Sequence, residues 1–412
     1  MTDPEPAPSP EERLAALVRA HERWRGHGVF NLLPSENALS PTARKYLASD
    51  LAGRYTLPVT TEKDGETVDN SYTGTRYTDE IEAIGNAAAA RIFHGRHATV
   101  RPLSGHIAAL SALVPLLPPK SKLLAISPEE GGYDGYAPGF IPALFGYTMR
   151  PLPAEGPGHR VLAEQAVATI RSERPNAVVL GQSFFLFPYP LKEIAEAAHA
   201  IDALVFYDAS HVLGLVAGGE FQDPLREGAD VLYGSTHKSF PGPQGGVLVT
   251  EREDLFRQID PALVWRIFDN AHWNRIAAVT QTLLELERVG RDYARTIVEN
   301  SQALGQSLSS LGLPLVAEPE GFTRSHQLHL DPHRLRSTHG IGPAALARRL
   351  EKQRLLIDLV ARIGTAEATR LGLTPAEMPR LADLLVRGGL KSEKVGSEVL
   401  AWRRSYRDLR FA

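Results

Sequence analysis

The amino-acid sequence predicts an α/β fold with a mostly parallel sheet, and three observations support this prediction. Between residues 122 and 202, short apolar runs typical of buried strands alternate with helical stretches in a βαβ pattern. The 412 residues suffice for two domains of ~100–200 residues each. Hydrophobic residues form 43% of the chain and charged residues 23%, as in ordinary soluble proteins. We therefore expect a large α/β domain with helices on both sheet faces, followed by a smaller domain.

Composition narrows the possible classes of function. The formal net charge is -3, so the chain lacks the basic field that attracts nucleic acid or anionic membranes. There are no cysteines, which excludes disulfides, cysteine zinc sites and thiol nucleophiles. No run is long enough to span a membrane, and the amino terminus has no signal-peptide pattern. We expect a cytoplasmic protein that binds no nucleic acid, membrane or metal.

The first part of the chain contains few regular elements. After an acidic, proline-rich tail, Ser9 and Pro10 predict a helix start with acids in its first turn. The polar residues 35–37 interrupt an apolar stretch, where turn formation explains them as well as function does. Residues 59–71 are polar and without periodicity, which predicts a long mobile or substrate-facing loop. An amphipathic helix is expected over 78–93.

A possible anion site follows. A short strand after residue 97 leads into a helix that begins at Ser104 and Gly105. Free backbone N–H groups and a hydroxyl at a helix start can bind a phosphate. Serine is also an ordinary N-cap, so this signal is weak on its own. Strands are then expected at 122–127 and 177–183, with helices at 161–173 and 191–202.

Two strand ends carry the strongest chemical signal. An apolar run ends at Asp208, with His211 three residues later, and sites in open α/β sheets form beyond the carboxyl ends of strands. Lys238 lies on a Pro/Gly-stiffened connection between apolar runs at 230–234 and 245–250. Burial there would lower the pKa of the amine from ~10.4 toward neutrality, which suits a Schiff base. An exposed loop lysine is the plainer alternative, but a nearby Asp and His favour pyridoxal phosphate chemistry.

The carboxyl-terminal part is expected to form the smaller domain. A proline-free helix over 276–312 is typical of a connection between a large and a small domain. A strand at 327–331, a helix at 343–355 and a terminal helix follow. A Rossmann fold is not supported, because no GxGxxG turn follows a strand.

These residues resemble the serine hydroxymethyltransferase family of fold type I pyridoxal phosphate enzymes. The resemblance runs from NLLPSENALSP to ARIGTAEATRLG, and GSTHKSFPGPQGG and GFTRSHQLHLD look most like archaeal members. It implies an aspartate aminotransferase-like fold with three parts. Residues 1–70 would form an N-terminal arm and dimer-contact segment, 71–275 the large cofactor-binding domain, and 276–412 a small α+β domain.

The resemblance implies a role for each matching residue. Lys238 would bind the cofactor covalently, Asp208 would pair with the pyridine nitrogen, and His211 would lie on the hydroxyl side of the ring. His237 and Thr236 would flank the covalent linkage. The phosphate would be held by these residues: Ser104, Gly105, Ser183 and, from a second subunit, Tyr55, with Asn270 in a segment that contacts the partner's phosphate.

The substrate side of the implied site is also shared. Arg362 would bind the substrate carboxylate with help from Ser35, because a guanidinium fits that planar anion. Tyr72 would come from the neighbouring subunit, so the resemblance implies a homodimer with shared active sites. The expected catalytic residues are Lys238, His211, His237, Thr236 and Tyr72.

The sequence departs from the family pattern at three places. Leu57 stands where the family has a glutamate that handles a proton during folate-coupled transfer, which puts tetrahydrofolate use in doubt. Glu62, Asp64 and Glu66 in the following loop are the candidate substitutes for it. Tyr133 stands where members often have histidine, so it is the expected group over the ring. His106 replaces a small residue next to the phosphate.

We therefore predict pyridoxal phosphate-dependent cleavage or formation of the Cα–Cβ bond of a serine- or threonine-like amino acid, with an aldehyde as partner and without folate, as in a threonine transaldolase. One alternative is a serine hydroxymethyltransferase that uses a tetrahydrofolate or a modified one. Others are transamination, racemisation or Mannich-type condensation on the same fold. A non-catalytic relative that binds the cofactor is a further alternative, although such a binder has no need of Lys238.

Overall fold

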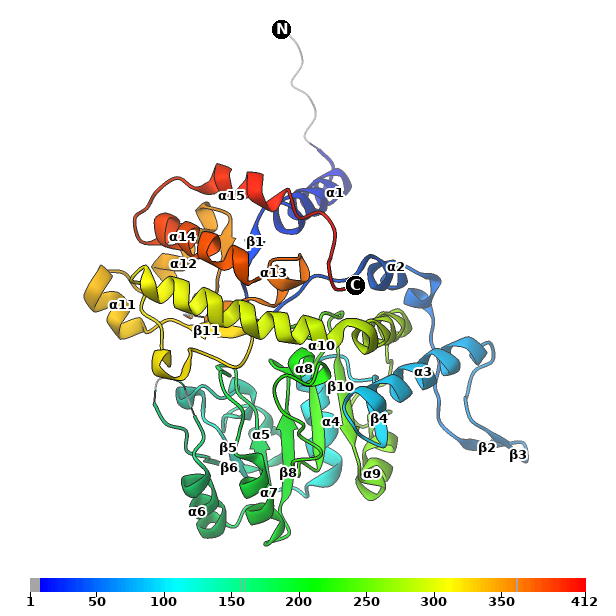
Figure 1. Cartoon of the computed structure of the whole chain (residues 1–412). Coiled ribbons are helices and arrows are strands. Elements are labelled where there is room, and N and C mark those ends of the chain that lie inside the picture. The colour runs from blue at the N-terminus through cyan, green and yellow to red at the C-terminus, as the bar shows by residue number, and fades with distance from the viewer. Residues whose placement is uncertain (1–7, 157, 159, 361) are drawn as a thin grey trace.

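In the computed structural model, which describes residues 8–156, 158, 160–360 and 362–412, a seven-stranded sheet forms the centre (Figure 1). The acidic tail at residues 1–7 lies outside this part. The strand order is β4-β10-β9-β8-β7-β5-β6, and only β10 runs antiparallel to its neighbours. The predicted α/β class with a mostly parallel sheet is therefore confirmed. The strands are β4 (His97–Thr99), β5 (Lys122–Ala125), β6 (Thr148–Pro151), β7 (Ala177–Leu180), β8 (Leu204–Asp208), β9 (Val231–Ser235) and β10 (Gly246–Thr250).

The sheet is buried on both faces because alternate side chains of each strand enter two different cores. In β8, Val205 and Tyr207 pack into one core, and Phe206 packs into the other. Helices α3 (Arg76–Ile92), α7 (Leu191–His199) and α10 (Trp273–Ser310) cover the first face. Helices α4 (Gly105–Leu116) and α9 (Glu253–Leu263) cover the second.

The long helix α10 lies between the central sheet and a second, smaller group of elements (Figure 1). Its residues from Trp273 to Ile297 pack into a core of the sheet, whereas Leu304 and Leu308 pack into the smaller core. Phe30 and Leu32, far away in sequence, belong to that smaller core too. The division at residues 70 and 275 stays a prediction.

The smaller group combines short strands with helices. Its strands pair as β1 (Phe30–Asn31) with β12 (Leu355–Leu356), and β11 (Gln327–His329) with β13 (Arg362–Gly364). Its helices are α11 (Pro332–His339), α12 (Pro343–Lys352), α13 (Ala366–Arg370), α14 (Met378–Gly389) and α15 (Gly396–Arg403). The remaining helices are α1 (Pro10–His21), α2 (Pro41–Leu47), α5 (Ile141–Phe145), α6 (Ala163–Glu173) and α8 (Leu213–Ala217).

The prediction of an irregular loop at residues 59–71 is wrong, because this segment forms a hairpin of β2 (Thr61–Lys63) and β3 (Glu66–Val68). Asp64 and Gly65 have φ values of 51° and 81°, and an Asp-Gly pair with positive φ favours a type I′ turn. Its strands are polar, so hydrophobic alternation did not reveal them. The hairpin projects from the body of the molecule (Figure 1).

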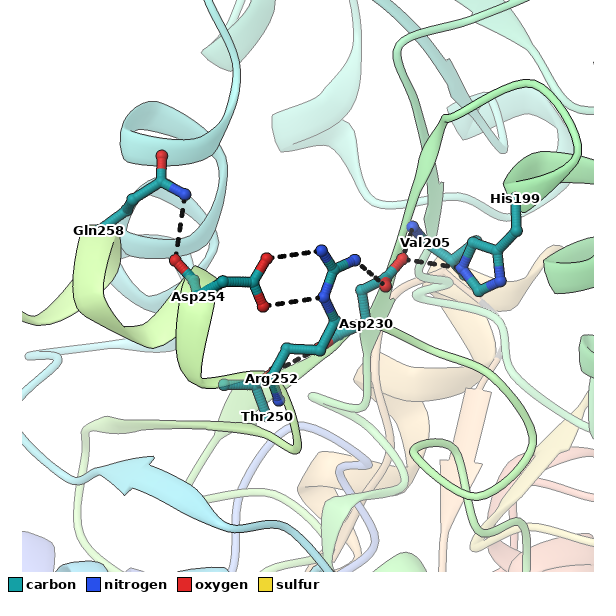
Figure 2. A network of polar contacts seen from close by, with 7 residues as sticks. All are labelled: His199, Val205, Asp230, Thr250, Arg252, Asp254 and Gln258. Carbon is teal, nitrogen blue, oxygen red and sulfur yellow. Dashed lines mark hydrogen bonds and ion pairs between the residues drawn. The ribbon is translucent and has the colours of Figure 1, made fainter.

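A polar network connects neighbouring elements at the end of the sheet where β9 begins (Figure 2). Buried Asp230, just before β9, accepts hydrogen bonds from the Val205 backbone N–H at 2.8 Å and from Arg252 at 2.9 Å. His199 of α7 lies 3.0 Å from the same carboxylate. Charged hydrogen bonds of this kind fix α7, β8, β9 and α9 relative to one another. Across the described residues, no helix is long and apolar enough to span a membrane.

Candidate active site

The candidate site lies beyond the carboxyl ends of two neighbouring parallel strands. Asp208 is the last residue of β8 and is in register with Tyr233 of β9, three residues before Thr236. Lys238 follows on the connection to β10. Because adjacent parallel strands end at one edge of a sheet, Asp208 and Lys238 lie on the same side of it, as the sequence predicts.

Asp208 is a buried and oriented carboxylate. It is 6% exposed, and its two oxygens accept hydrogen bonds from the Tyr136 hydroxyl at 2.6 Å and from the Ser210 backbone N–H at 2.9 Å. Tyr136 also contacts the Tyr233 hydroxyl at 2.7 Å. Burial and the nearby Asp208 raise the pKa of Tyr136 well above its usual value, so it stays a neutral donor. Tyr136 and Tyr233 had no recognisable signal in the sequence.

Lys238 carries an amine that is partly neutral near physiological pH. Burial lowers its pKa to about 8, Asp208 opposes that shift, and Arg362 adds to it. Its Nζ lies 3.4 Å from Nε2 of His211. The Lys238 backbone carbonyl accepts a hydrogen bond from Asn37 at 2.8 Å, which fixes the connection. Such a lysine is suited to nucleophilic attack on a carbonyl group.

Two predicted residues flank the lysine. Thr236 is fully buried, and its hydroxyl donates to the Pro243 carbonyl at 2.7 Å, so it stiffens the connection. Burial, and then the neighbouring Lys238, lower the pKa of His237 to about 4. The Nδ1 atom of His237 is buried without a hydrogen-bond partner among the described residues. His237 is therefore a neutral imidazole next to Lys238.

Arg362 is held in a fixed orientation. Its Nε donates to Asp358 at 2.6 Å and its Nη1 donates to the Ser183 carbonyl at 2.6 Å. The guanidinium also lies 4.9 Å from the ring centroid of Phe184. Ser35 is half-buried, and the backbone of the preceding Pro34 packs against the strand that begins with Arg362. These contacts fix the plane of a guanidinium, the group predicted from the sequence to bind the substrate carboxylate.

The start of α4, at Ser104 and Gly105, is the predicted phosphate cradle. Ser104 is the N-cap, and its hydroxyl accepts a hydrogen bond from the Ile107 backbone N–H at 3.1 Å. A Cβ at Gly105 would lie 2.1 Å from the Ser235 hydroxyl and 3.0 Å from that of Ser210, so only glycine fits. Ser210 and Ser235 were not predicted as site residues, although Ser210 follows β8 and Ser235 ends β9.

The side chains of Tyr133 and His106 contact each other. The Tyr133 hydroxyl lies 3.0 Å from Nδ1 of His106, and its ring meets the Tyr136 ring edge-on at 5.4 Å. Burial lowers the pKa of His106 and raises that of Tyr133. Since Tyr136 binds Asp208, Tyr133 lies one ring away from that carboxylate.

Three predicted residues lie apart from this cluster. Tyr55 donates to Asp269 at 2.9 Å, and its ring contacts that of Tyr72 at 5.2 Å. Both tyrosines are exposed, at 38% and 49%. Asn270 follows Asp269 and caps the His272 backbone N–H at 3.3 Å. In the described part of the chain, no hydrogen bond joins these three residues to Lys238.

These features fit pyridoxal phosphate. Asp208 is a buried carboxylate for a protonated ring nitrogen, and Lys238 has the lowered pKa that covalent capture of an aldehyde needs. At the predicted phosphate cradle, a Cβ on Gly105 would clash with the Ser235 hydroxyl, so the start of α4 approaches the strand ends as closely as only a glycine allows. On this sheet topology, the combination defines a fold type I pyridoxal phosphate-dependent enzyme.

Comparison of this sequence with those of known proteins identifies its family. The family model of serine hydroxymethyltransferase matches residues 10–340. The serine hydroxymethyltransferase of Pyrobaculum neutrophilum is 37% identical over 412 residues, covering 96% of this chain and 93% of that protein. That of Methanopyrus kandleri is 35% identical, covering 97% and 95%. The chain therefore belongs to the serine hydroxymethyltransferase family, whose members are pyridoxal phosphate-dependent enzymes.

A solved structure shares the fold. The crystal structure of L-threonine transaldolase from Pseudomonas fluorescens matches with a TM-score of 0.86 and 22% sequence identity, covering 97% of this chain and 93% of that one. The predicted fold type I architecture is therefore confirmed.

Proposed function

We propose that the protein cleaves or forms the Cα–Cβ bond of a β-hydroxy-α-amino acid without folate, releasing or adding an aldehyde. The observation that carries this proposal is Leu57. Its side chain is 7% exposed and cannot move a proton, at the position where the family uses a glutamate for folate-coupled transfer. The name of the structural relative, a threonine transaldolase, agrees with this choice.

The substitute acids for Leu57 give little support to folate chemistry. Glu62, Asp64 and Glu66 are all exposed on the projecting hairpin. Glu62 accepts a hydrogen bond from Thr67 at 2.5 Å within that hairpin.

The proposed roles follow from the contacts. Lys238, Asp208, Ser104 and Gly105 would hold the cofactor, with Ser183 near the phosphate and Tyr133 facing the ring. When bound, pyridoxal phosphate supplies an electron sink for the carbanion at Cα.

On the substrate side, Arg362 binds the carboxylate and, with Ser35, orients the Cα–Cβ bond. A base accepts the β-hydroxyl proton as this bond breaks and the aldehyde leaves. His237, whose Nδ1 has no hydrogen-bond partner among the described residues, and Tyr72 are the side chains proposed to move that proton.

A homodimer with shared sites is part of the proposal. The first helix, α1, has no buried residue and exposes Leu14, Leu17 and Val18 at helical spacing. Tyr55 and Tyr72 are likewise exposed near Asp269. A second copy that covers these side chains would bring the tyrosines into its own site.

A serine hydroxymethyltransferase activity is the second candidate. It is favoured by the identity of 37% to a relative of that name.

One assay separates the two candidates. The purified holoenzyme is incubated with L-threonine or L-serine, with and without tetrahydrofolate, and the released acetaldehyde or formaldehyde is measured. We expect aldehyde release that tetrahydrofolate leaves unchanged. Release that strictly requires tetrahydrofolate would exclude the folate-independent proposal and favour the second candidate.

A further inference from the structure

A row of buried polar side chains leads from the lysine into the protein. Nε2 of His211 lies 3.4 Å from the Lys238 amine, and its Nδ1 lies 2.8 Å from the amide nitrogen of Gln327. The amide oxygen of Gln327 lies 2.8 Å from Nε2 of His329. His211, Gln327 and His329 are 4%, 0% and 3% exposed, so bulk water does not compete for these contacts.

Two backbone groups fix which way the Gln327 amide points. The Ser183 carbonyl, which can only accept, lies 3.3 Å from Nε2 of Gln327. The Phe185 N–H, which can only donate, lies 3.4 Å from Oε1. In a flipped amide, the NH₂ group of Gln327 would face the Phe185 N–H, and its oxygen would face the Ser183 carbonyl oxygen. Gln327 therefore presents an N–H group, and not an oxygen, to His211.

This orientation determines the proton state of His211. Because the Gln327 amide donates, Nδ1 of His211 must accept and carries no proton. A neutral imidazole then has its proton on Nε2, which faces Lys238. A second proton on His211 would place N–H against N–H inside the core, with no water to separate the two groups.

The surroundings of His211 oppose a positive charge as well. The side chains that act on it are Lys238, Arg362, His326 and His237, all of them basic. His326 stacks on His211 with ring centroids 5.7 Å apart, and its Nε2 donates to the Pro34 carbonyl at 3.1 Å. Burial, and then these neighbours, hold the pKa of His211 well below 6.5.

We propose that Gln327 is a positioning residue that holds His211 as the neutral imidazole protonated at Nε2, so that His211 presents an N–H group to the Lys238 nitrogen, which accepts it when that amine is neutral, and cannot serve as the base. Its Nε2 already carries a proton, and its Nδ1 is covered by Gln327. The β-hydroxyl proton must then go to another group, such as His237. This inference concerns the resting protein, so it stands whether or not folate takes part.

The direct test is nitrogen NMR of the holoenzyme labelled with ¹⁵N-histidine, with the His211 signals assigned from their loss in His211→Asn. We expect a pyridine-type Nδ1 and a pyrrole-type Nε2 that persist from about pH 6 to about pH 9. A protonated Nδ1, or a doubly protonated ring at about pH 6, would overturn the proposal. The same spectrum of the apoenzyme above about pH 8, where the Lys238 amine is largely neutral, should give the same result, because Gln327 is part of the chain.

Two substitutions test the role of the amide. In Gln327→Glu the carboxylate accepts from Nδ1, so His211 should gain a second proton and the acid limb of the pH profile for aldehyde release should move up by about one unit or more. In Gln327→Met no donor remains, so the Nδ1 signal should show a mixture of tautomers and kcat should fall about tenfold with little change in KM.

Gln353→Glu is the matched control. Gln353 is a half-buried amide in the smaller group of elements whose oxygen accepts from the Gly396 N–H at 3.0 Å, a bond that a carboxylate keeps. It should leave the His211 signals unchanged. An unaltered Nδ1 signal in folded Gln327→Glu would show that Gln327 does not set the proton state of His211.

Discussion

The burial of the Lys238 amine makes the stability of the protein depend on pH. Its pKa is lowered to about 8 in the folded chain and returns to about 10.5 in the unfolded chain. Between these values the unfolded chain binds more protons, so the free energy of unfolding should rise with pH across this window. The amine is also half neutral at about pH 8.

Competitive acylation of the apoenzyme at varied pH, followed by peptide mapping, measures this directly. We expect the labelling rate of Lys238 to rise with pH and to level off above about pH 8. Labelling that still rises steeply above about pH 10 would show an ordinary exposed amine.

A substitution at Leu57 is expected to change the folate dependence of the reaction. In Leu57→Glu, burial raises the carboxyl pKa and makes it able to exchange protons near neutral pH. Tetrahydrofolate should then stimulate cleavage of L-serine, by up to ~10²-fold, the usual size of general acid–base catalysis. Leu57→Gln is the control, because it is polar but cannot exchange a proton. Equal folate response in both variants would rule out this role for position 57.

Residues next to strand ends could be predicted, and residues that reach the site from elsewhere could not. Asp208 and Lys238 end or follow apolar runs, so local sequence marks them. Tyr136 and Gln327 contact the site from 72 and 116 residues away, and only folding brings them there. Gln327 does lie in a fully buried strand, where a polar side chain needs a partner.

Among the elements, the start of α4 makes the clearest prediction. In Gly105→Ala the new Cβ would lie 2.1 Å from the Ser235 hydroxyl, so the cradle must open or lose its bound anion. We expect the affinity for pyridoxal phosphate to fall at least about tenfold, measured by absorbance titration of the apoenzyme. Gly139→Ala, where nothing lies within 4 Å of the new Cβ, should keep wild-type affinity. Equal affinities of the two variants would argue against a phosphate at α4.

Elements with an apolar period were predictable, and the β2–β3 hairpin was not. Its strands are three residues each and carry no hydrophobic alternation, so only the Asp64-Gly65 turn signalled them. The direction of β10 could not be predicted from the sequence either. The antiparallel setting of β10 arises from tertiary pairing with β4 and β9, which short apolar runs do not encode.

At the scale of the whole molecule, the shared-site homodimer predicts that two inactive variants recover activity when their chains are mixed. When Lys238→Ala and Tyr72→Phe chains are mixed, half of the dimers are mixed, and one of their two sites has both residues. Activity should return to about a quarter of the wild-type value. Mixing Lys238→Ala with Arg362→Ala should give no recovery, because both residues belong to one subunit's site. Equal recovery in the two mixtures, or none in either, would contradict the shared site.

The single helix α10 has a consequence for cooperativity. Its 38 residues extend about 57 Å at 1.5 Å per residue, with one stretch in a sheet core and its last turns in the smaller core. Buried Asn300, between these stretches, donates to Thr369 at 2.8 Å and to the Leu373 carbonyl at 2.9 Å. Neither core can melt without fraying the same helix. The two parts are therefore expected to unfold together, so that damage in one removes the other's support.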